Sequence, residues 1–185
     1  VSFAYNYENV RLNKGEIRRK DIVYNYRYAG GDVTIYKMTG KQLKDYMEWA
    51  ADYFDTIQPG DTEYRYNGER AGRKYVTFDI FGGVKYKIDL RNEKGNKITN
   101  LMLVNGKEIT SEMELKVGMN AYRFEQLARK GGIFDGQEIP VLWASKEAIG
   151  EIDGTIQNMM IDYIRNVKNG VIEGKSHNNW EIIGL

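Results

Sequence analysis

The segment Asp32-Val-Thr-Ile-Tyr-Lys-Met-Thr-Gly-Lys-Gln-Leu-Lys-Asp-Tyr-Met-Glu-Trp49 specifies a strand followed at once by a helix. Residues 33–38 are mostly β-branched or apolar, a composition typical of a strand. Thr39 and Gln42 then stand three residues apart, the spacing of a capping box, in which each side chain satisfies a free backbone N–H. Apolar residues follow with the 3.6-residue period of a helix: Leu43, Tyr46, Met47, Ala50, Ala51 and Phe54. The segment predicts a strand, a tight turn and an amphipathic helix over residues 40–55.

Short helices and strands are predicted along the rest of the chain. Further helices are expected near residues 125–130, 146–150 and 154–169, and strands near 32–38, 75–80, 84–90, 98–104 and 115–122. Asn92-Glu-Lys-Gly95 and Asn105-Gly106 are typical of hairpin turns. Hairpins beside a few separated helices predict an α+β fold with a mixed sheet and packed helices, not a doubly wound parallel sheet.

Length and composition bound the function. A chain of 185 residues suits one domain, and 27 basic against 26 acidic residues gives a net charge of +1. Such a balance gives no support to a nucleic-acid polymer or an anionic membrane as partner. We find no apolar stretch of membrane-spanning length and expect no membrane insertion. The absence of cysteine excludes disulfides and thiolate chemistry.

The inventory of reactive side chains argues against catalysis by this chain. It has one histidine, His177, in a polar stretch that we interpret as a surface loop. A two-metal phosphatase site needs several histidine, aspartate and asparagine ligands, and a histidine-assisted nucleophile would have to use His177 itself. Two carboxylate pairs at a spacing of three, Asp45 with Glu48 and Asp52 with Asp55, are predicted to lie on a solvated helix face. We therefore expect no catalytic residue and no metal or other cofactor in this chain.

Several motifs occur in one order along roughly residues 10–183. Besides the Thr39-Gly40 segment they are Asn13–Ile22, Tyr75–Leu90, Ile98–Thr110, Met119–Arg123 followed by Gly131-Gly132, and Asn178–Ile183. Together they resemble the 5'-nucleotidase C-terminal domain family, and within it the 2',3'-cyclic-nucleotide phosphodiesterase branch.

The resemblance implies a nucleotide-recognition domain of a metal-dependent phosphoesterase that hydrolyses 2',3'-cyclic nucleotides, nucleoside monophosphates or both. It also implies a separate N-terminal metallophosphatase domain in the parent chain, holding two divalent metal ions. Residues 1–185 would then be one substrate-binding domain excised from a longer chain. The implied location is extracellular, cell-wall-associated or periplasmic. The preferred base and the position of the phosphate stay open.

Tyrosine is the residue type best suited to hold a base here, with 14 tyrosines against 6 phenylalanines. Stacking a base on an aromatic ring contributes about 1–3 kcal/mol. Strand tyrosines can equally line half-buried sheet faces. In the family, two rings from separate loops hold the base, and the resemblance assigns the second ring to Tyr122 of Asn120-Ala121-Tyr122. The first ring falls in the loop 26–32, where counting back from Thr39 reaches Ala29 and a one-residue slip reaches Tyr28.

Three more positions complete the candidate site that the resemblance implies. Arg123 could face a phosphate or pair with a carboxylate. Gly83 matches a glycine that lets backbone approach the ligand, although a β-bulge glycine would look the same. The segment Arg123–Lys130 is longer than in relatives and is predicted to form a short helical turn carrying Phe124 and Leu127 inward. The candidate substrate-binding residues are Tyr122, Tyr28, Asn120, Gly83, Arg123 and Phe124.

A competing hypothesis is a non-enzymatic adhesion or protein-binding module whose nucleotide pocket has decayed. The unusual loop at residues 26–32 and the longer segment after Tyr122 favour it. Nucleoside binding distinguishes the two hypotheses.

Overall fold

The computed structural model describes residues 12–68 and 79–185. Its first sheet has three strands in the order β4-β1-β5, and both pairings are antiparallel. The strands are β1 (Val33–Thr39), β4 (Glu114–Asn120) and β5 (Val141–Ala144). In β1 every second side chain, at Thr34, Tyr36 and Met38, is buried, as expected for a strand with one face against a core.

Helix α2 (Gly40–Ala51) follows β1 directly, as predicted from the sequence. The Thr39 N–H donates to Gln42 Oε1 at 2.9 Å, and the Gln42 N–H donates to Thr39 Oγ1 at 3.2 Å, which confirms the capping box. The helix ends at Ala51 rather than at residue 55, and Asp52 caps it.

The second sheet has the order β3-β2-β6, with strands β2 (Val84–Asp89), β3 (Ile98–Leu103) and β6 (Trp180–Ile183). Strand β2 pairs antiparallel with β3 and parallel with β6. The α+β class is confirmed, with the strands divided between one antiparallel and one mixed sheet.

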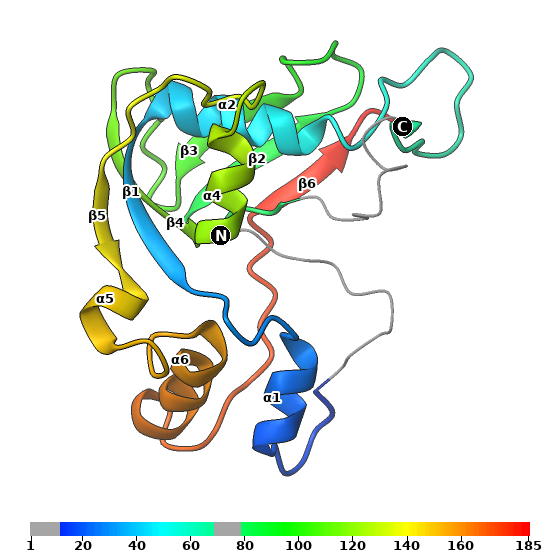
Figure 1. The fold of residues 1–185 in the computed structure, drawn as a ribbon. Helices are drawn as coiled ribbons and strands as arrows, with labels where there is room; N and C mark the ends of the chain where they lie inside the picture. Colours follow the sequence, from blue (N-terminus) through cyan, green and yellow to red (C-terminus); the bar gives the residue numbers. More distant parts are fainter. Residues whose placement is uncertain (1–11, 69–78) are drawn as a thin grey trace.

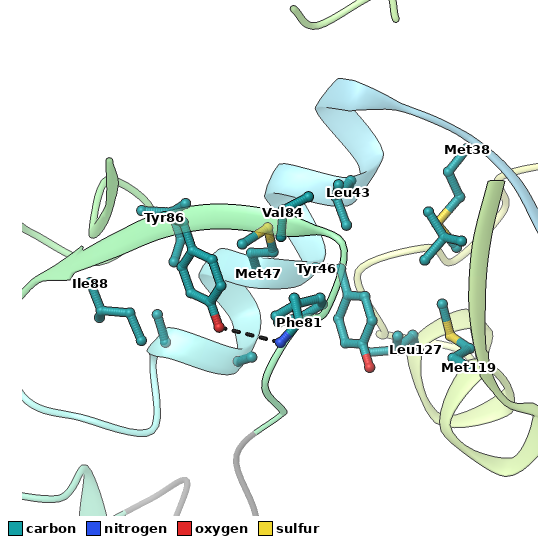
Figure 2. Close-up of a cluster of buried hydrophobic side chains, with 14 of the residues drawn as sticks. Met38, Leu43, Tyr46, Met47, Phe81, Val84, Tyr86, Ile88, Met119 and Leu127 are labelled. Carbon is teal, nitrogen blue, oxygen red and sulfur yellow. Dashed lines mark hydrogen bonds between the residues drawn. The ribbon is translucent and has the colours of Figure 1, made fainter. Parts of the chain in front are cut away.

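The core lies where α2 meets both sheets. Figure 2 shows Tyr46 and Met47 of α2 beside Phe81, Tyr86 and their neighbours. The Phe81 N–H donates to the Tyr86 hydroxyl at 3.3 Å, and burial raises the pKa of Tyr86 to about 12. Tyr46 meets the Phe81 ring edge to face at 4.8 Å between centroids. Aromatic rings therefore join α2 to the second sheet.

A group of helices lies below the strands in Figure 1. It consists of α1 (Arg19–Asn25), α5 (Ser145–Ile149), α6 (Ile156–Asp162) and the π-helix η1 (Tyr163–Val167). The periodic segment 154–169 is helical as predicted, although its second half widens into the π form. Helix α1 was not predicted from the sequence, because Ile22 is its one buried side chain and it has no apolar stripe.

Several boundaries differ from the sequence predictions. Strand β4 ends at Asn120, and helix α4 (Ala121–Ala128) begins there instead of near residue 125. Strands β5 and β6 were not predicted, because each has four residues, too few for a clear alternation. The strand predicted at 75–80 falls largely outside the described residues.

Glu48 corrects the prediction of a solvated carboxylate pair on α2. Its side chain is buried and accepts hydrogen bonds from the backbone N–H groups of Lys97 and Ile98 at 2.9 and 2.8 Å. Asp52 and Asp55 lie beyond the last residue of the helix. His177 is exposed in an irregular segment, as predicted. Within residues 12–68 and 79–185, no helix combines the length and apolar character needed to cross a membrane.

Candidate ligand-binding site

A cavity of about 760 Å³ lies between the loop after α1 and the first turns of α4. Residues 26–32 line one side, and residues 120–126 without Phe124 line the other. Its volume falls within the range of about 300–1,000 Å³ typical of small-molecule sites.

The strand pairing explains why these two distant segments meet. Val33 at the start of β1 pairs with Asn120 at the end of the antiparallel β4. The chain that enters β1 and the chain that leaves β4 must therefore emerge at the same end of the sheet. The structure thus brings together Tyr28, Asn120, Tyr122 and Arg123 among the candidate residues.

Tyr28 and Tyr122 line the cavity with exposed rings, at 60% and 57% exposure. Tyr122 lies in the first turn of α4 and not on a sheet face. Both Ala29 and Tyr28, the two alternatives for the first ring, line the cavity, but only Tyr28 carries an aromatic side chain. Two exposed rings from separate segments give the cavity flat apolar surfaces.

Asn120 joins the two sides of the cavity. Its Oδ1 accepts a hydrogen bond from the Tyr122 N–H at 2.8 Å and so caps α4. Its Nδ2 donates to the hydroxyl of Tyr26 at 2.6 Å, across 94 positions of sequence. Asn120 is among the residues predicted from the sequence, but this role of Tyr26 is not. The one sequence signal for Tyr26 is that it alternates with two other tyrosines, Tyr24 and Tyr28.

Gly31 lets the loop approach Tyr26 closely. A Cβ atom at Gly31 would lie 2.5 Å from the Tyr26 hydroxyl oxygen and 3.2 Å from Asn120 Nδ2. Burial is the main reason that the pKa of Tyr26 is raised, so its phenol is neutral at physiological pH.

Arg123 pairs with a carboxylate, which is one of its two predicted roles. Its Nη2 donates to Asp79 Oδ1 at 3.0 Å, and Nε forms an ion-pair contact with Oδ2 at 2.8 Å. The Tyr46 hydroxyl also donates to Asp79, at 2.7 Å, and the guanidinium lies over the Trp49 ring, 5.2 Å from its centroid. These contacts attach α4 to α2 and orient the charge of Arg123 toward Asp79.

Phe124 and Gly83 lie apart from the cavity lining. The Phe124 ring stacks on Tyr36 with centroids 3.9 Å apart and packs against the core, so the predicted inward turn is confirmed. Gly83 lies just before β2 with φ of +84°, and its carbonyl accepts a hydrogen bond from the Val104 N–H at 3.4 Å. That backbone conformation favours glycine in a turn.

Charged groups of both signs border the cavity. Asp32 and Glu125 contribute carboxylates, and Arg27 contributes a cation whose guanidinium lies 4.6 Å from the centroid of the Tyr24 ring. In the described part of the chain, no group of three or more histidine, aspartate or glutamate side chains is placed to hold a metal ion.

Comparison with known proteins shows which family the chain resembles. The sequence profile of the family described as "5'-nucleotidase, C-terminal domain" matches residues 2–129. The chain is 25% identical over 189 residues to the 2',3'-cyclic-nucleotide 2'-phosphodiesterase/3'-nucleotidase of Haemophilus influenzae, covering 94% of this chain. It is 31% identical over 180 residues to the trifunctional nucleotide phosphoesterase protein YfkN of Bacillus subtilis, covering 91% of this chain. The chain spans 27% and 11% of the lengths of these relatives.

Solved structures share the fold. A putative 5'-nucleotidase from Staphylococcus aureus superposes with a TM-score of 0.67 at 23% identity, covering 88% of this chain and 29% of that one. The NAD nucleotidase of Haemophilus influenzae superposes with a TM-score of 0.59 at 17% identity, covering 91% and 27%. Because the profile matches well over half of the chain, we conclude that this chain belongs to the 5'-nucleotidase C-terminal domain family.

Proposed function

We propose that this domain binds the nucleoside part of a nucleotide in the cavity between residues 26–32 and 120–126. The observation that carries the proposal is that Tyr28 and Tyr122, both exposed, line the same cavity. Two exposed rings that line one cavity can stack a base from both sides.

The proposed parent activity is hydrolysis of 2',3'-cyclic nucleotides, nucleoside monophosphates or both. The relatives named above carry such activities in their names, which supports the proposal. By the resemblance to the family, we assign two divalent metal ions to an N-terminal metallophosphatase domain of the parent chain. By the same resemblance, we propose an extracellular, cell-wall-associated or periplasmic location.

The cavity's side chains suit a nucleoside better than a bare phosphate. Both arginines of the lining have partners in the protein: Arg123 pairs with Asp79, and the Arg27 guanidinium lies over the Tyr24 ring. The carboxylates of Asp32 and Glu125 also border the cavity. Carboxylates accept hydrogen bonds from ribose hydroxyls or base amino groups but repel phosphate oxygens. The phosphate is therefore proposed to remain outside the cavity, free to meet the metal centre.

A three-ligand binding experiment tests this assignment. We expect adenosine and AMP to bind with affinities within a few fold of each other, by ligand-observed NMR or calorimetry, and to compete. Ribose 5-phosphate, which keeps the sugar and phosphate but lacks the base, should not displace adenosine. Displacement by ribose 5-phosphate would contradict the placement of the phosphate outside the cavity. Binding of neither adenosine nor AMP would contradict the nucleoside site and favour the adhesion module.

A further inference from the structure

We propose that Tyr26 is a positioning residue that fixes the two stacking rings relative to each other. This inference rests on the proposed nucleoside site. Tyr26 has a contact on each side of the cavity. Its ring meets the Tyr28 ring edge to face, with 5.6 Å between the centroids. Its hydroxyl accepts the hydrogen bond that Asn120 Nδ2 donates. Asn120 in turn holds the Tyr122 N–H. One side chain thus links the segment of Tyr28 to the segment of Tyr122.

The loop that carries Tyr26 is itself attached to α6, and Gly31 leaves room for the Tyr26 side chain. Its backbone carbonyl accepts a hydrogen bond from Gln157 Nε2 of α6 at 2.6 Å. The Gly31 carbonyl accepts a hydrogen bond from the Ile156 N–H at 2.8 Å, so both ends of the loop are attached to α6. The absence of a Cβ at Gly31 leaves the space that the Tyr26 hydroxyl occupies.

A link of this kind matters because the rings themselves are exposed. Tyr28 is 60% and Tyr122 57% exposed, and a base stacks between two rings only when the rings stand at the right spacing. Holding binding groups in place before the ligand arrives lowers the ordering cost of binding. Loss of the Tyr26 hydroxyl should leave both rings present but less well placed.

A double-mutant cycle on adenosine binding tests the inference. Tyr26→Phe removes the hydroxyl and keeps the ring. Asn120→Ser keeps a good helix cap for Tyr122 but is too short to reach Tyr26. We expect each variant to bind adenosine about three- to tenfold more weakly, and the double variant to bind no more weakly than either single one. Tyr163→Phe, a tyrosine on η1 outside the cavity, is the matched control and should bind as the wild type does.

The outcomes separate this inference from the proposed function. No adenosine binding by the wild type would overturn both. Wild-type binding with unchanged affinity in Tyr26→Phe, or losses that multiply in the double variant, would overturn the positioning role alone. Melting temperatures are measured on all variants to show that each one folds. If Tyr26→Phe does not fold, Asn120→Ser serves as the test, and an unchanged affinity for adenosine in that variant would overturn the positioning role of Tyr26.

Discussion

At the scale of single residues, Tyr122 carries the clearest consequence. Its ring is 57% exposed in the first turn of α4, so it stabilises the fold little. Tyr122→Ala should weaken nucleoside binding by about 1–3 kcal/mol, while the free energy of unfolding changes by less than about 0.5 kcal/mol. Tyr122→Phe should keep most of the affinity, because the ring does the stacking. Calorimetry and thermal melting on both variants check this, and a destabilised alanine variant with normal binding would remove Tyr122 from the site.

Glu48 gives a second prediction at this scale, on pH dependence. Burial raises its pKa above the usual glutamate value, although the Lys97 and Ile98 N–H groups oppose the shift. A folded state with the higher pKa binds more protons, so its stability should fall as pH rises from the ordinary glutamate pKa through the raised one. NMR titration of the Glu48 carboxyl carbon, together with unfolding of Glu48→Gln across that range, measures both effects. An apparent pKa at or below the ordinary value would contradict the prediction.

At the scale of elements, the junction of β1 and α2 depends on Gly40. A Cβ atom there would lie 2.0 Å from the Thr110 carbonyl oxygen, a backbone atom that cannot move aside freely. We expect Gly40→Ala to reduce the free energy of unfolding by about 3 kcal/mol. Gly174→Ala is the matched control, since nothing lies within 4 Å of its Cβ position and its φ is not positive. Equal denaturation midpoints for the two variants would show that the close approach is not required.

The elements of the fold differ in how well they can be predicted from the sequence alone. The capping box and the apolar stripe of α2 follow from local chemistry, and the structure confirms them. Strand β6 pairs parallel with β2, a contact between distant segments that no local pattern reports. The early start of α4 was missed because the cap at Asn120 lacks the acidic or amide partner three residues on that signals a capping box.

Part of the candidate site could likewise be predicted from the sequence, and part could not. Tyr122 and Asn120 were named on a motif, and the antiparallel pairing of β1 with β4 places them opposite the loop of Tyr28. The roles of Tyr26 and Asp79 could not be predicted, because each depends on a side chain far away in the sequence. Tyr26 shows this most clearly, since its partner Asn120 lies 94 residues along the chain, whereas Arg123 lies 44 residues from Asp79.

At the scale of the whole molecule, the cavity lies between two supports. The loop 26–32 is attached to the lower helices through Gln157 and Ile156 of α6. Helix α4 is attached to α2 through Arg123 and Asp79, whose carboxylate also meets Tyr46. Figure 1 shows α4 beside α2 and the strands, with α1 and α6 below them. The proposed ligand site therefore lies at the junction of the helical group and the sheets.

Protein-observed NMR during an adenosine titration tests that placement most directly. We expect amide shifts to change in residues 26–32 and 120–126, the two segments that border the cavity. The exposed surface of η1 around Tyr163 and Val167 serves as the internal control and should not respond. Shift changes confined to η1, or absent at saturating adenosine, would contradict the claim that this cavity is the nucleoside site.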